Sequence, residues 1–259
     1  MHRLHSVIRI PIVILLATLV SNYSHLAHAV SMDDLVKRDN LFFEKFTNTP
    51  FTGKVDEGLF RGAISKGLRQ GEWIAYYESG QLRNQSTWRN GKKHDEWISY
   101  HDNGQLDEVG KYSNGAKIGF WKGYYPNGQL EYDGRYMIDR LANDCHIEPN
   151  SIGSYNTLDS LFCSEGVEDG LWLRYHENGT LRVKYQMVGG KTEGRWETYH
   201  DNGQIEIEGA FRNGEKHGVF KVYDSSGNLD NTPHPILDQF RGTFVDGKKV
   251  ESIPPNKID

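Results

Sequence analysis

The chain has 259 residues, of which 37% are hydrophobic and 12% aromatic, and its formal net charge is −5. That hydrophobic share is too low for a thick globular core. The acidic balance argues against a partner bound through its phosphates, such as a nucleic acid, because that binding needs clustered Lys and Arg. It also weakens attraction to anionic lipids, so membrane association is not expected.

The N-terminal segment has the order of features that is typical of a secretory signal peptide. Two arginines and no acidic residue precede an apolar run over 10–20, and an Ala-His-Ala site ends at Ala29. A membrane-spanning helix needs roughly 20 apolar residues, more than this run contains. We therefore expect residues 1–29 to be removed, and the mature chain, 30–259, to be periplasmic or secreted.

A 24-residue repeat dominates the rest of the sequence. An aromatic residue recurs at this spacing, as Trp73, Trp97, Trp121, Trp172, Trp196 and Phe220. A tyrosine follows each of them by three positions, as Tyr76, Tyr100, Tyr124, Tyr175, Tyr199 and Tyr223. Repeats of this length stack and bury a continuous core, and each large buried ring stabilises it by about 2–3 kcal/mol. We therefore predict that the two rows form the core.

Two glycine turns in each repeat predict two short strands. One turn follows the tyrosine, as in Asn127-Gly128, and the other closes the unit, as in Asn90-Gly91. Asn-Gly between aromatic-rich runs is the strongest short-range signal for a β-hairpin, because both residues tolerate positive φ. The sequence thus predicts about 12–14 antiparallel strands in a single layer. The Trp-to-Tyr spacing of three breaks strict alternation, so we expect a bulge or a bend between the two residues.

The full unit resembles the bacterial variant of the MORN repeat family, which reads G-x-W-x-x-Y-x-x-N-G-Q-L and then Y-x-N-G-K-x-x-G. Residues 119–130 fit the first motif throughout, and the resemblance covers about 50–136 and 168–248. Asp95 departs from it, since most copies have glycine there, and Phe220 replaces a tryptophan. The resemblance implies a stack of hairpins. Family members are scaffolds, membrane-associated modules and antitoxin components, but an export signal conflicts with neutralising a cytoplasmic toxin.

The repeat is interrupted between Trp121 and Trp172, where 27 residues are added to one period. The excess falls within 137–167 and is expected to form a loop, which either carries a binding site or is only tolerated. The two cysteines of the chain, Cys145 and Cys163, lie in this insertion. In an oxidising compartment such a pair predicts a disulfide, and two buried thiols are the alternative.

Three histidines share one repeat position, and each precedes an acidic residue: His101, His176 and His200. A row of metal sites is one interpretation, but equivalent residues of adjacent repeats should lie roughly 10 Å apart, which is two strand spacings. Zinc ligands must approach one ion to about 2 Å. We therefore interpret the histidines as a solvated row beside the turn.

Lys93, Lys117 and Lys216 share a position near the opposite turn, which predicts a basic edge along the stack. That edge either recognises a partner or protects exposed turns. A shorter insertion over 231–238 contains two prolines and predicts a rigid loop without a specific role.

The sequence contains no phosphate-binding loop, zinc-binding cysteine cluster or nucleophile elbow. We therefore expect no enzymatic activity, no cofactor and no metal site. The predicted fold is an all-β, elongated, single-layer antiparallel stack of β-hairpin repeats with one disulfide-stapled insertion. The expected segments are a lead-in or cap (30–60), repeats (61–136), the insertion (137–167), repeats (168–248) and a tail (249–259).

The function that the sequence predicts is that of an exported scaffold or adaptor that binds another protein of the cell envelope. One alternative is a glycan or peptidoglycan binder whose Tyr and Trp rows stack on sugar rings. The others are a membrane-surface module and an antitoxin-like component.

Overall fold

The computed structural model describes residues 30–138, 146–147, 161–162 and 166–250. The predicted signal peptide, both cysteines and residues 251–259 lie outside the described residues. Within the described part, the regular structure consists of strands and two short 3₁₀ helices. No helix there is long and apolar enough to cross a membrane.

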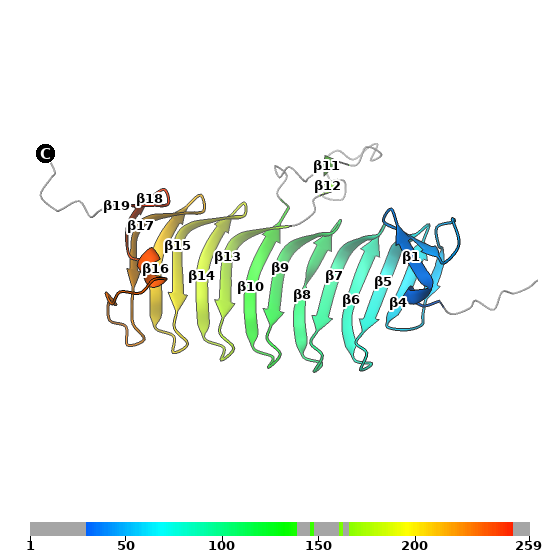
Figure 1. Cartoon of the computed structure of the whole chain (residues 1–259), viewed down its shortest axis with the longest axis horizontal. Coiled ribbons are helices and arrows are strands. Elements are labelled where there is room, and N and C mark those ends of the chain that lie inside the picture. Colours follow the sequence, from blue (N-terminus) through cyan, green and yellow to red (C-terminus); the bar gives the residue numbers. More distant parts are fainter. Residues whose placement is uncertain (1–29, 139–145, 148–160, 163–165, 251–259) are drawn as a thin grey trace, which may run out of the picture.

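Fifteen strands form one antiparallel sheet, in which each strand pairs with its neighbours along the chain (Figure 1). Its first half holds β3 (Gly53–Val55), β4 (Phe60–Ser65), β5 (Leu68–Tyr76), β6 (Leu82–Arg89), β7 (Lys92–Tyr100), β8 (Leu106–Ser113), β9 (Ala116–Tyr124) and β10 (Leu130–Met137). Its second half holds β13 (Val167–Tyr175), β14 (Leu181–Val188), β15 (Lys191–Tyr199), β16 (Ile205–Arg212), β17 (Glu215–Val222), β18 (Gly242–Val245) and β19 (Lys248–Val250). Figure 1 shows these strands side by side along the long axis of the molecule. The predicted all-β stack of hairpins is confirmed.

The Asn-Gly turns adopt the backbone conformation that the sequence predicts. In the short turn between β6 and β7, Asn90 and Gly91 have φ angles of 49° and 75°. In the longer turn between β7 and β8, the Asn103 side-chain oxygen accepts a hydrogen bond from the Gln105 N–H at 2.9 Å. Because both turns recur, the strands keep similar lengths and stay in register.

The predicted bulge near the tyrosine is present, but it lies in the partner strand. At the end of β5 the pairing shifts between Ala75 and Tyr76, because β6 contains the additional residue Arg83. Alternation along β5 from Trp73 to Tyr76 therefore continues without a break. As a result Trp73 and Tyr76, three residues apart, lie on opposite faces of the sheet.

A second irregularity lies just before each aromatic residue of the repeat. The pairing of β8 with β9 shifts between Val109 and Lys111, opposite Gly119. Gly119 has a φ of 68°, and a side chain added there would meet open space. Asp95 takes the equivalent position with a φ of 59°, which is an unfavourable conformation for a residue that carries a Cβ.

We call the face that carries Trp73 and its equivalents the aromatic face. Its rings contact one another edge-to-face along the sheet: Tyr112 lies 5.0 Å from Trp121, and Tyr136 lies 5.1 Å from Trp172, between centroids. The row continues through Trp196, Phe211, Phe220 and Phe244. Edge-to-face pairs are favourable, so the single-layer sheet has its core on this one face.

Each of the most deeply buried rings lies against a glycine of the preceding strand in the sheet. A Cβ at Gly110 would lie 2.1 Å from the Trp121 ring, and one at Gly134 would lie 2.3 Å from the Trp172 ring. Among the aromatic residues of the 24-residue row, the four that cover a glycine are at most 3% exposed: Trp73, Trp121, Trp172 and Phe220. Trp97 and Trp196 pair instead with Ser86 and Tyr185 on that strand, and both are half-buried.

The tyrosine row stands on the face opposite the aromatic row, so it is not part of the same core. The Tyr199 hydroxyl donates to Glu197 at 3.0 Å, and the Tyr223 hydroxyl donates to Glu208 at 2.6 Å. All six tyrosines of the row are half-buried. The physical reason is the odd spacing, since a residue three positions along a strand faces the other way. The tyrosines that pack on the aromatic face are Tyr112, Tyr132, Tyr136 and Tyr185.

The N-terminal segment caps the first end of the aromatic face. β1 (Leu35–Arg38) and β2 (Leu41–Glu44) form a separate hairpin. Leu35 lies in one buried cluster with Phe51, Val55, Ile64 and Trp73. This cluster joins the hairpin to the first repeat.

The segment after β17 caps the other end of the aromatic face. The 3₁₀ helix η3 (Leu237–Gln239) leads to Phe240, whose ring stacks on Trp196 with centroids 5.8 Å apart and an interplanar angle of 6°. An ion pair of 3.3 Å between Asp230 and Arg241 joins the two ends of this segment. The sequence predicts that the shorter insertion is a rigid loop without a specific role. In the structure it leads directly to Phe240, which covers the end of the aromatic core.

The long insertion does not interrupt the sheet, because β10 pairs directly with β13. The Asn127 side-chain amide donates to the Glu177 carbonyl at 2.9 Å across this junction. Within the insertion, β11 (His146–Ile147) pairs with β12 (Leu161–Phe162). Cys145 and Cys163 lie outside the described residues, so the disulfide between them stays a prediction.

Candidate functional site

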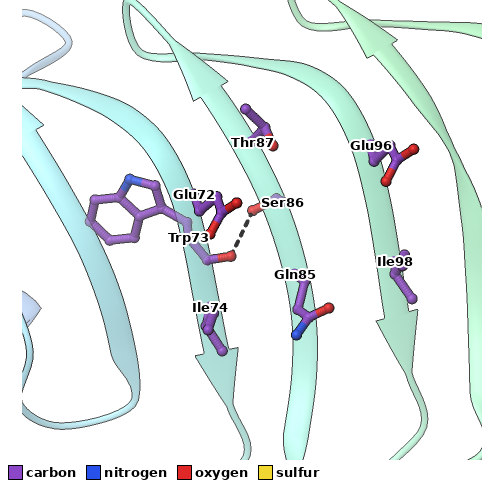
Figure 2. Close-up of a pocket in the computed structure, with 8 residues that line it drawn as sticks. All are labelled: Glu72, Trp73, Ile74, Gln85, Ser86, Thr87, Glu96 and Ile98. Carbon is purple, nitrogen blue, oxygen red and sulfur yellow. Dashed lines mark hydrogen bonds between the residues drawn. The ribbon is translucent and has the colours of Figure 1, made fainter.

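We call the sheet face opposite the aromatic face the outer face. Both caps pack against the aromatic face, so they leave the outer face open. On β5, β6 and β7 the outer face carries Glu72, Ile74, Gln85, Thr87, Glu96 and Ile98. Figure 2 shows that the Trp73 indole points away from these side chains, as the alternation of a strand requires.

A groove crosses the outer face over β5 to β9. One hollow of about 190 Å³ is lined by Glu72 and Glu96, and an adjoining hollow of about 310 Å³ is lined by Val109 and Phe120. Glu96 and Ile98 line both hollows. The groove therefore runs from an acidic end toward a more apolar end.

One position of the repeat carries exposed apolar side chains on the outer face. It is the residue immediately before the aromatic one, and it is occupied by Phe120 in β9, Leu171 in β13 and Val219 in β17. These side chains are 74%, 50% and 57% exposed. Strand spacing puts Phe120 and Leu171 roughly 10 Å apart and Leu171 and Val219 roughly 19 Å apart, so they are separate apolar points in one row that crosses the strands. We call these three residues the apolar line.

Charged residues surround the apolar line and pair with one another. Lys122 lies 3.3 Å from Asp133, and Glu208 accepts from the Tyr223 hydroxyl at 2.6 Å and from Lys221 at 3.2 Å. The hydrogen bond from Tyr223, together with Lys221, lowers the pKa of Glu208 against a smaller opposing effect of burial. The outer face thus combines apolar and charged groups, as the surfaces of protein interfaces do.

The lysine row does not form the predicted basic edge. The Nζ atoms of Lys93, Lys117 and Lys216 lie 3.7, 4.0 and 3.8 Å from the centroid of an aromatic ring. These are cation–π distances, and they place the lysines on the aromatic face. Each lysine lies four positions before the aromatic residue of its repeat, and an even spacing along a strand puts both side chains on the same face.

The histidine row links consecutive repeats and is not the fully solvated row that the sequence predicts. Nε2 of His101, His176 and His200 lies 2.7, 2.9 and 3.0 Å from the carbonyl oxygen of the tyrosine in the next repeat. A carbonyl can only accept, so Nε2 carries the proton and donates. In the part of the chain that the structure describes, no group of three His, Cys, Asp or Glu residues could hold a metal ion.

The apolar line was not singled out by sequence reasoning. Its signal is present in the repeat alignment, where the position before the aromatic residue is apolar in some copies and charged in others. Phe120, Leu171 and Val219 take it in three copies, and Glu72, Glu96 and Arg195 take it in the other three. The face on which this position lies becomes clear only when the strand register is known.

Comparison with known families identifies the repeat. A family model described as MORN repeat variant matches residues 69–90, 96–114, 119–137, 168–188 and 192–213. Each matched segment overlaps two consecutive strands of the sheet. A search of curated proteins finds no match.

Proposed function

The chain belongs to the MORN repeat variant family, and we propose that it is a non-catalytic scaffold that binds another protein through its outer face. Repeats of this family commonly mediate protein or membrane binding and are generally non-catalytic. The observation that carries the proposal is the exposed apolar line of Phe120, Leu171 and Val219. Burying side chains of this size against a partner would stabilise a complex.

A protein suits this face better than a membrane does. Ion pairs such as those of Lys122 with Asp133 and of Lys221 with Glu208 interleave with the apolar line. A lipid interface would require a broad apolar face bordered by basic residues. The net charge of −5 opposes such an interface, whereas alternating charges can match a protein partner.

The proposed location of this scaffold is the cell envelope, after removal of residues 1–29. The features that support it are the signal-like N-terminus and the two cysteines, which are next in sequence to the paired residues His146 and Phe162. We propose that Cys145 and Cys163 form a disulfide there. Intact mass of the secreted protein before and after reduction and alkylation tests both points, since a full-length N-terminus or two free thiols would contradict them.

The test of the binding face is a crosslinking pull-down from envelope extract with the tagged chain 30–259. The test variant replaces the apolar line by serine: Phe120→Ser, Leu171→Ser and Val219→Ser. The control variant is Val188→Ser with Val245→Ser, because these side chains are 56% and 48% exposed but lie at strand ends beside turns. Both variants should melt near the wild-type temperature, since exposed residues contribute little to stability.

The expected result is one identified protein that the wild-type chain and the control variant capture and the test variant loses. Equal capture by all three chains would contradict binding through the apolar line. Recovery of lipid vesicles rather than a protein would favour the membrane alternative.

A further inference from the structure

A second hollow lies on the aromatic face, between the N-terminal cap and the middle of the sheet. Its volume is about 200 Å³, and it is formed by β4 to β7. Half-buried rings of Phe60, Trp88 and Trp97 line it, so aromatic surface is available to a ligand. This hollow is on the other side of the sheet from the groove of the outer face.

Three cations line the same hollow: Arg69, Arg83 and Lys93. None of its lining residues is acidic. No carboxylate of the described residues forms an ion pair with Arg69 or Arg83. A lining with three cations and no acidic residue is unexpected in a chain whose net charge is −5.

Aromatic rings fix the cations in place. The Arg69 guanidinium carbon lies 4.5 Å from the Trp73 ring centroid and 4.8 Å from that of Trp88, and the Lys93 Nζ lies 3.7 Å from that of Trp97. The Nε of Arg69 is buried and has no hydrogen-bond partner among the described residues. A buried donor without a partner requires an explanation, such as a bound acceptor or ordered water.

The cations also repel one another. Burial, and then the charge of Arg83, lower the pKa of Arg69. Burial lowers the pKa of Lys93 as well, and Lys117 and Arg69 add to that effect while Glu108 opposes it. An anion in the hollow would relieve this repulsion, because opposite charges stabilise one another strongly where water is partly excluded.

We propose that this hollow binds a small anionic ligand, namely a single ring that carries a carboxylate or a phosphate. The hollow is smaller than the roughly 300–1,000 Å³ that is usual for drug-sized ligands. A ligand with a single ring is therefore the largest that would fit. The rings of Trp88 and Trp97 offer a stacking surface for the ring of the ligand. Arg69 and Arg83 offer guanidinium donors, which suit the planar geometry of a carboxylate or a phosphate.

The test is the quenching of Trp fluorescence in the chain 30–259, titrated with glucuronate, glucose and inorganic phosphate. Glucuronate and glucose share the sugar ring, and the carboxylate distinguishes them. We expect glucuronate to bind at least about tenfold more tightly than glucose, since a hydrogen bond to a charged group contributes strongly. Phosphate should displace glucuronate, because both would use the same cations.

Arg83→Gln and Lys93→Gln test the assignment to this hollow, and each should weaken glucuronate binding by about fivefold or more. Arg182→Gln is the matched control, because Arg182 takes the same repeat position as Arg83 but is exposed in β14, whereas Arg83 is half-buried. Thermal melts show whether each variant is folded, and an unfolded Lys93→Gln would leave Arg83→Gln to decide the assignment.

Three outcomes would overturn the proposal: no quenching by any probe, which would mean that the hollow holds only water; equal affinity for glucose and glucuronate; or equal losses in Arg83→Gln and Arg182→Gln. Because the apolar line is on the opposite face, loss of the protein partner and loss of the anion are separate results.

Discussion

At the scale of single residues, the burial of each Trp or Phe in the 24-residue row follows the residue beneath its ring. Trp121 lies over Gly110 and is fully buried, whereas Trp97 pairs with Ser86 and is only half-buried. A glycine lets the ring approach the backbone of the next strand, and any Cβ would hold it away. The glycine is therefore required for close approach rather than for an unusual backbone angle.

Gly110→Ala should reduce the free energy of unfolding by about 1–3 kcal/mol, the range for overpacking a tight core. The reason is that the new Cβ would lie 2.1 Å from the Trp121 ring. Urea unfolding followed by Trp fluorescence measures the effect. Lys111→Ala, which truncates an exposed side chain of the same strand, is the control and should change the free energy by less than about 1 kcal/mol; equal losses in the two variants would refute the packing argument.

A pH-dependent contribution to stability is expected from Glu208, whose folded-state pKa is lowered by Tyr223 and Lys221. A lowered pKa stabilises the fold above the unfolded pKa, near 4.5, and this stability is lost as the pH falls through the folded pKa. Tyr223→Phe should raise the pKa of Glu208 and make the melting temperature fall less between pH 7 and acid. An NMR titration of Glu208 gives the pKa directly, and an unchanged value in the variant would contradict this assignment.

At the scale of elements, each repeat is joined to the next by the sheet ladder and by side chains of the turns. The Tyr125 hydroxyl donates to the Tyr175 carbonyl at 2.8 Å, and Asn127 donates to the Glu177 carbonyl at 2.9 Å. These two bonds cross the junction that the long insertion separates in sequence. The strand pairing and the turn contacts thus continue as though the insertion were absent.

Replacing residues 139–165 by a short Gly-Ser linker should therefore leave the melting temperature close to that of the wild type. Ile138 and Gly166 must remain, because Ile138 packs on Ala116 and a Cβ at Gly166 would lie 2.0 Å from the Lys117 carbonyl oxygen. Differential scanning calorimetry is the measurement. A large loss of stability, greater than that of Asn127→Ala, would show that the insertion supports the sheet.

The hairpins were predictable from the sequence because their signals are local. The Asn-Gly turns and the 24-residue period fix where strands begin and end without any knowledge of their neighbours. The faces were harder to predict, because the sequence does not show which strand holds the bulge. The extra residue, Arg83, lies in the partner strand, so alternation continues from Trp73 to Tyr76 and the tyrosine row leaves the core. The even spacing of Lys93 and Trp97 does indicate one shared face, and the predicted basic edge did not take it into account.

At the scale of the whole molecule, the two faces of the sheet differ: one holds the core, and the other is open to solvent. The aromatic face holds the ring contacts and both caps, so it supplies the stability that a repeat stack builds from nearest-neighbour contacts. The outer face contributes the groove and the apolar line of Phe120, Leu171 and Val219. This division suits the proposed scaffold function, because residues of the outer face can change without disturbing the core.

The most direct test of this account is photo-crosslinking in the living cell, with a photoreactive phenylalanine analogue in place of Phe120 or of Val188. Both side chains are exposed, but only Phe120 lies in the groove of the outer face. The account predicts that one protein, identified by mass spectrometry, is crosslinked from position 120 and not from position 188. Equal labelling from both positions, or no protein from position 120, would contradict binding through the outer face.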